Sequence, residues 1–190
     1  MATIEIVNYQ ERWPTEFESI AVAMRAALGS NVVRIDHIGS TSVPGLSAKD
    51  IIDIQISVSD LDNKDALLPL EKLGYPRPKH NNDVLVGLED DSPELQKLFL
   101  KEPAGQRRTN IHVREVGRLN QAYPLLFRDY LRADSRIREA YQMIKIELAA
   151  RFPEDIDAYY AIKDPYMDTV YQAALLWAKQ NDWQLDQNFL

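Results

Sequence analysis

The clearest pattern of hydrophobic and polar positions is the alternation over residues 51–58, IIDIQISV, in which every second residue is Ile or Val. A period of two is typical of a β-strand with one face packed on a core. Asp53 and Gln55 then share the opposite face, roughly 7 Å apart along the strand. A carboxylate among isoleucines is unusual for a strand, which suggests a function at Asp53.

Other segments follow the same two periodicities. Trp13-Pro14 suits the first turn of a helix that Gly29 ends, and a shorter helix begins after Asp60 or Asp62. Strands are expected at 4–9, 32–38, 51–58, 83–88, 95–100 and 110–116, with a loop at 75–82. Four later segments are apolar on one helical face: 121–133, 135–151, 154–162 and 165–180.

The order of these elements predicts an α+β fold. Strands and helices are mixed up to about residue 118, and only helices follow. We expect a mixed β-sheet with helices on one face, its other face open for a ligand. Residues 1–118 would form the α/β core and residues 119–190 a C-terminal helical region, packed together as one compact unit.

Composition narrows the possible partners. The net charge of −7 argues against bulk binding of nucleic acid but permits a small anionic ligand held by a few local cations. The chain has no cysteine, so a metal ion would need oxygen or imidazole ligands. No apolar run approaches the ~20 residues of a membrane span, and no signal peptide is evident. We therefore expect a cytoplasmic protein with no membrane partner.

The loop Gly39-Ser40-Thr41-Ser42 lies between two predicted strands. Small residues let backbone N–H groups approach an anion, and hydroxyl groups add further donors. Lys49, at the entrance of the second strand, could add positive charge. The alternative is an ordinary Gly/Ser turn, which the composition alone would equally allow.

Three stretches together resemble one protein family: HIGSTSVPGL at 37–46, KDIID at 49–53 and NIHV at 110–113. They resemble the GrpB family, as does LLFRDYLR at 125–132, and the resemblance extends from about residue 7 to 163. It implies the nucleotidyltransferase fold, in which a Gly-Ser turn precedes a strand bearing two carboxylates. Asp53 matches the first carboxylate, but Gln55 stands where the second would be.

In that fold the strand carboxylates hold Mg²⁺ or Mn²⁺ against the phosphates of a nucleotide. The resemblance therefore makes Asp53, Gln55 and His112 the candidate metal ligands. His112 shares a strand face with Asn110 and could also accept a proton, so Asp53 and His112 are the candidate catalytic residues. The alternatives are an exposed or ion-paired Asp53, an exposed Gln55 and a structural His112. With one carboxylate, the metal would be held weakly and mainly through the nucleotide's phosphates.

Cations of the helical region are further candidates. The resemblance implies that Arg128, Lys145 and Lys163 contact the phosphates, as Lys and Tyr of C-terminal helices do in this fold. The alternative is a solvated, ion-paired helix face, the usual environment of such residues.

Two functions follow from these residues. The first is metal-dependent binding of a nucleotide or another phosphate-bearing molecule, with transfer of a nucleotidyl group to an unknown acceptor. The second is a nucleotide-binding or protein-interaction module without turnover, which the missing second carboxylate favours.

Overall fold

A five-stranded mixed β-sheet forms the centre of the molecule. The computed structural model describes residues 3–185 of the chain. The strand order is β1-β2-β5-β4-β3; β2 and β5 are parallel and the other neighbours are antiparallel. The strands are β1 (Arg34–Ile38), β2 (Ile52–Val58), β3 (Lys79–Asn82), β4 (Gln96–Lys101) and β5 (Thr109–Glu115).

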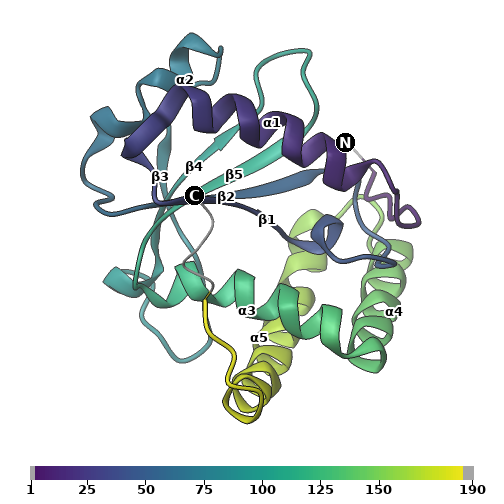
Figure 1. Cartoon of the computed structure of the whole chain (residues 1–190). Helices are drawn as coiled ribbons and strands as arrows, with labels where there is room; N and C mark the ends of the chain where they lie inside the picture. The colour runs from purple at the N-terminus through teal and green to yellow at the C-terminus, as the bar shows by residue number, and fades with distance from the viewer. Residues whose placement is uncertain (1–2, 186–190) are drawn as a thin grey trace.

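Helices lie on both sides of this sheet. Figure 1 shows α1 and α2 above the sheet and the three later helices below it. The helices are α1 (Trp13–Leu28), α2 (Pro69–Lys72), α3 (Leu119–Ala133), α4 (Ser135–Arg151) and α5 (Ile156–Gln180). Short 3₁₀ turns are η1 (Gly29–Asn31), η2 (Ser40–Ser42), η3 (Lys64–Leu67) and η4 (Pro93–Leu95). The α+β fold, with a mixed sheet and a C-terminal helical region, is thus confirmed.

The main hydrophobic core lies between α1 and the sheet. The alternating Ile and Val residues of β2 point toward this helix, as their period of two predicts. Ile52, Ile54 and Ile56 are fully buried, and burying each such side chain contributes roughly 1.5–3 kcal/mol. The stripe of α1 that covers them consists of Trp13, Phe17, Ala21, Met24 and Leu28.

A second core joins the C-terminal helices to the segment after β1. Val43 and Leu46 pack among apolar side chains of α3, α4 and α5. Ile4 also contacts this region, because it packs with Leu148 of α4 and Tyr159 of α5 and its backbone N–H donates to Pro153 O, between these helices, at 2.7 Å. The helical region is therefore packed against the segment that precedes β2 and against Ile4.

Three of the expected elements are wrong. Residues 83–88 form no strand; β3 lies earlier, in the segment expected to be a loop. Val84 and Val86 are 73% and 71% exposed, so the alternation there has no core to pack on. The expected strand at 4–9 is reduced to a single bridge between Val7 and Ala48.

The third error concerns the last helices, which were expected to separate near Pro165. Instead α5 runs through this proline as one helix of 25 residues. A proline inside a helix costs about 3 kcal/mol, but packing on both sides of it compensates here. Tyr159 lies in one core cluster before Pro165, and Val170 and Tyr171 lie in another after it. No helix among residues 3–185 is long and apolar enough to cross a membrane.

Candidate functional site

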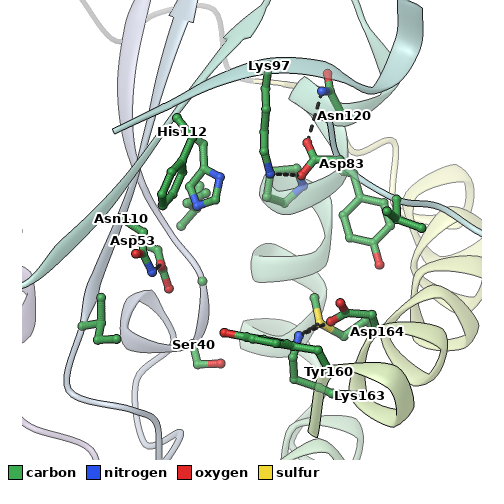
Figure 2. Close-up of a pocket in the computed structure, with 18 of the residues that line it drawn as sticks. Ser40, Asp53, Asp83, Lys97, Asn110, His112, Asn120, Tyr160, Lys163 and Asp164 are labelled. Atoms are coloured by element: carbon green, nitrogen blue, oxygen red, sulfur yellow. Dashed lines mark hydrogen bonds and ion pairs between the residues drawn. The ribbon is translucent and has the colours of Figure 1, made fainter. Parts of the chain in front are cut away.

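A cavity of about 680 Å³ separates the polar face of the sheet from the C-terminal helices. Its floor is formed by side chains of β2, β4 and β5, and its opposite wall by side chains of α3, α4 and α5. Figure 2 shows Asp53, Asn110 and His112 on the sheet side and Tyr160, Lys163 and Asp164 on the helix side. The polar face of the sheet lines a cavity as expected, but the prediction that helices cover only one face is wrong, because the helical region encloses the other face (Figure 1).

Asp53 lies on the cavity floor next to β5. Its Cα partners are Ile38 on β1 and Asn110 on β5, and its Oδ1 accepts a hydrogen bond from Asn110 Nδ2 at 2.8 Å. Burial raises the pKa of this carboxyl group, and the bond from Asn110 and the charge of Lys49 oppose that shift. A carboxylate placed at this cost in a cavity is a candidate functional group.

Gly39 is required by the position of Asp53. Its φ of +69° is one that side-chain-bearing residues rarely adopt, and a Cβ atom at this position would overlap the carboxylate of Asp53. The absence of a side chain at Gly39 therefore lets the loop approach the carboxylate of Asp53 closely.

Only part of the Gly39–Ser42 loop faces the cavity. Gly39, Ser40 and Thr41 line it, whereas the Ser42 hydroxyl is turned inward and donates to Gly39 O at 2.6 Å. The Thr41 hydroxyl donates to Ile51 O at 3.3 Å. The Ser40 hydroxyl stays on the cavity side, where it is hydrogen-bonded to the side chain of Tyr141.

Lys49, Lys145 and Lys163 all line the cavity and lie close enough for their charges to act on one another. Lys49 Nζ donates to the Tyr160 hydroxyl at 2.7 Å and lies 4.6 Å from the centre of that ring. Lys163 Nζ lies 2.5 Å from Asp164 Oδ1 and 5.2 Å from the Tyr160 ring. Two ammonium groups at the Tyr160 ring, with Lys145 on the neighbouring Tyr141 and Asp164 as the paired acid, form a site suited to an anion.

Lys145 is the most buried of these lysines, with 3% of its surface exposed. Its Nζ donates to Ser47 O at 2.5 Å and lies 4.8 Å from the ring of Tyr141. Burial, together with the charges of Lys163 and Lys49, lowers its pKa to about 7. An anionic ligand would stabilise the charged form of this amine.

His112 lies beside Asp53 on the floor, two residues along β5 from Asn110. Its Nδ1 is buried and has no hydrogen-bond partner among residues 3–185. Burial, then the charges of Arg114 and Lys97, keeps the pKa of the ring well below its usual value, so the imidazole is neutral. A neutral ring can bind metal or exchange a proton, although the unpartnered Nδ1 itself is buried away from the cavity.

Gln55 and Arg128 lie outside the cavity, unlike the other candidates on the strand and helices. Gln55 is fully buried; its Oε1 accepts from Arg114 Nη1 at 2.7 Å and its Nε2 donates to Gln121 O at 2.9 Å. Both ends of this amide are engaged, so the structure places Gln55 under α3 and not where we expected a metal ligand.

Arg128 instead supports the Gly39–Ser42 loop from behind. Its Nη1 donates to His37 O at 3.0 Å, just before the loop. Arg132 does the same at the last residue of the loop, with Nη2 donating to Ser42 O at 2.7 Å. The two arginines of α3 therefore hold both ends of the loop, and the expected contact of Arg128 with phosphate is replaced by this positioning role.

A cluster of charged residues around Asp83 in the cavity was not predicted from the sequence. Asp83 pairs with Lys97 and with Arg114, whose Nε lies 2.9 Å from Asp83 Oδ2, and it accepts from Asn120 Nδ2 at 3.1 Å. These cations keep the pKa of Asp83 far below its usual value despite its burial. The alternation of side chains along the strands could have placed Lys97 and Arg114 on one face of the sheet. Their partner Asp83, however, was predicted to lie in a strand that does not form.

The protein supplies few ligands for a divalent metal. No group of three His, Cys, Asp or Glu side chains that could hold an ion occurs in the described part of the chain. Asp53 offers a carboxylate and His112 an imidazole, fewer groups than Mg²⁺ takes in its octahedral shell. These residues fit a metal only if a bound ligand provides most of the remaining oxygens.

Comparison with known proteins identifies the family of this chain. The family model described as GrpB protein matches residues 3–173. The crystal structure of conserved protein GrpB from Enterococcus faecalis is 30% identical, with a TM-score of 0.74, over 95% of this chain and 100% of that one.

Two further similarities are more distant or partial. A dephospho-CoA kinase of Mycolicibacterium paratuberculosis is 34% identical over 96% of this chain, but the chain spans only 49% of that protein. A cytoplasmic RNA terminal U-transferase has a TM-score of 0.50 at 17% identity, over 76% of this chain and 43% of that one, which supports a nucleotidyltransferase-like fold. Given the family match over most of its length, the chain belongs to the GrpB family.

Proposed function

We propose that this protein binds a nucleotide or another phosphate-bearing small molecule in the cavity, with its phosphates at Lys49, Lys145 and Lys163. The observation that carries the proposal is the convergence of these lysines in a chain whose net charge is −7. Concentrated positive charge in a partly enclosed cavity attracts anions strongly, because water screens it less there than at an open surface.

Other residues near these lysines complete an anion site. The Ser40 hydroxyl lies on the cavity side, and the backbone of the loop is held by Arg128 and Arg132. Asp53 opposes the lysines and would repel a phosphate directly. A divalent metal between Asp53 and the phosphate would remove this repulsion. Asp53 and His112 would be its protein ligands, and phosphate oxygens would be the other ligands. Bound in this way, Mg²⁺ or Mn²⁺ would neutralise charge on the phosphates.

Nucleotidyl transfer is the reaction that this arrangement would support. Lysines that hold the terminal phosphates would stabilise the departing pyrophosphate as the acceptor oxygen bonds to the α-phosphorus. In a complex where Asp53 alone holds the metal, the neutral ring of His112 could take the proton of the acceptor. The second candidate is a binding module without turnover, favoured by the engagement of Gln55 with Arg114, which leaves one strand carboxylate in the cavity.

A thermal-shift screen tests binding. The compounds to test, each with and without Mg²⁺ or Mn²⁺, are nucleoside triphosphates, inorganic phosphate and dephospho-CoA. Dephospho-CoA is included because one relative is named dephospho-CoA kinase. A ligand at 100 times its Kd stabilises by about 2.7 kcal/mol, so a true ligand gives a clear rise in Tm. Lys49→Met and Lys163→Met should lose the rise, and Lys79→Met, on the exposed strand β3, should keep it. No rise with any phosphate compound would contradict the proposal.

The two candidates separate in a turnover assay. A transferase should release pyrophosphate from the stabilising nucleotide, and Asp53→Asn should abolish this while leaving the fold intact. A binding module should show the same thermal shift and no pyrophosphate from either variant. The cytoplasmic location expected from the sequence stays a prediction beside these proposals.

A further inference from the structure

The register of β4 and β5 fixes an order of side chains along the cavity floor. Lys101 pairs with Asn110, and Phe99 pairs with His112. Two residues further along β4 is Lys97, which meets Arg114 of β5 through their shared partner Asp83. Asn110 and Arg114 are four residues apart on one strand, roughly 13 Å. The cavity therefore has two charged ends, and a single phosphate group cannot reach both.

The end far from Asp53 contains a lysine with unused donors. Lys97 is 7% exposed and lines the cavity, and Figure 2 shows it grouped with Asp83 and Asn120, away from Ser40 and Lys163. An ammonium group has three donors. Asp83 accepts one, and the described residues offer Lys97 no second acceptor. Arg114, by contrast, directs its guanidinium to Asp83 and Gln55.

Aromatic rings separate the two ends. The rings of Phe99 and His112 lie 5.3 Å apart, edge to face, and both residues line the floor. Tyr123 and Met167 line the cavity from the helices α3 and α5. A flat ring with polar edges suits such a section, since its faces contact aromatic and thioether groups while its edge reaches a donor.

We propose that Lys97 is a specificity residue that donates a hydrogen bond to the base of a nucleoside polyphosphate whose phosphates lie at Lys49, Lys145 and Lys163. This rests on the proposed function and adds the class of ligand and its orientation. The acceptor is a carbonyl oxygen or ring nitrogen of the base, Asp83 positions Lys97, and the base lies over Phe99.

A structural role for Lys97 makes a different forecast. If Lys97 only neutralises Asp83, removing it lowers stability and leaves the choice between ligands unchanged. If Lys97 contacts the base, its removal weakens nucleotide binding and spares a ligand that has phosphates but no base. The readout is therefore the affinity ratio between two ligands, which a loss of stability alone does not move.

Isothermal titration calorimetry would measure this ratio. The titrants are ATP, GTP, CTP, UTP and inorganic tripolyphosphate, each against the wild type, Lys97→Met and the control Lys79→Met. A hydrogen bond from a charged donor is worth about tenfold or more in affinity. We expect the wild type and the control to bind at least one nucleotide about tenfold more tightly than tripolyphosphate, and Lys97→Met to lose that preference.

Two further variants make the outcome decisive. Lys97→Arg keeps the ion pair with Asp83 but moves the donor, so it should fold and also lose the preference. Lys49→Met should weaken nucleotide and tripolyphosphate alike. Equal affinities in the wild type, or a Lys97→Met effect shared by both ligands or absent from both, would overturn the assignment while leaving the phosphate site intact. If neither nucleotides nor tripolyphosphate bind, the proposed function fails as well.

Discussion

The two faces of strand β2 share one backbone but have different surroundings. On one face Ile52, Ile54 and Ile56 are fully buried against the core that α1 covers. On the other face Asp53 and Gln55 are polar, and only Asp53 lines the cavity. Gln55 is as buried as the isoleucines, but through hydrogen bonds to Arg114 and Gln121.

The comparison shows that the polar face of a strand is not itself a site. Position along the strand decides what each polar residue does, because α3 closes over Gln55 and leaves Asp53 open. All the isoleucines of the apolar face are buried in the same way, because hydrophobic burial has no preferred direction. Each hydrogen bond on the polar face, in contrast, requires one particular partner. Substitutions on the two faces should therefore differ in kind as well as in size.

The largest expected effect is on the apolar face. Ile54→Ala removes a fully buried side chain from the centre of the core and should lower the free energy of unfolding by about 2–5 kcal/mol. Urea denaturation measures this, with Val22→Ala on the exposed side of α1 as the control. Ligand affinity at a temperature where the variant is folded should not change. A loss below 1 kcal/mol would mean that this core is loosely packed.

The next effect lies where the loop meets the polar face. Gly39→Ala introduces a Cβ that overlaps the carboxylate of Asp53 at a positive φ, and it should destabilise by roughly 1–3 kcal/mol. In a background of Asp53→Gly the overlap disappears and the cost should shrink to that of the backbone alone. A double-mutant cycle in denaturant measures the coupling, and additive effects would contradict the close fit.

A matched pair of new carboxylates separates the two polar positions. Asn110→Asp places a second acid beside Asp53 in the cavity and should tighten Mg²⁺ binding. Gln55→Asp faces Gln121 O and Arg114, so it should cost about 1–3 kcal/mol for a lost hydrogen bond and leave Mg²⁺ affinity unchanged. Calorimetric titration with Mg²⁺ compares them, and tighter binding by Gln55→Asp would return this position to the site.

Much of this arrangement could be predicted from the sequence because it depends on local pattern. The alternation over 51–58 gave the two faces of β2, and the same parity put Asn110 and His112 beside Asp53. The family resemblance extended this to the fold. The formation of a strand depends mainly on local period and hydrophobicity, so it can be predicted without information about distant segments.

The rest depends on contacts between distant segments. Whether Gln55 is open or closed depends on Gln121, which is 66 residues away along the chain. The role of Arg128 depends on the carbonyl of His37, 91 residues away, and a helical charge pattern cannot reveal that partner. The cluster around Asp83 was missed for a related reason, because alternation predicted a strand where charge pairing and a loop prevail.

The smallest expected stability effect belongs to the residue most important for the proposed function. Burial raises the folded-state pKa of Asp53, so folding favours the protonated form of this carboxyl group. As the pH rises from the unfolded-state value, about 3.8, through the raised folded value, the wild type should lose stability relative to Asp53→Asn. At neutral pH the variant should therefore be at least as stable as the wild type, since Asn110 can still donate to the oxygen of the new amide. Thermal unfolding of both proteins across this pH range measures the difference. A variant that melts far lower at neutral pH would mean that the ionised carboxylate holds the fold together, and Asp53 would then belong with the structural residues on this face and not with the site.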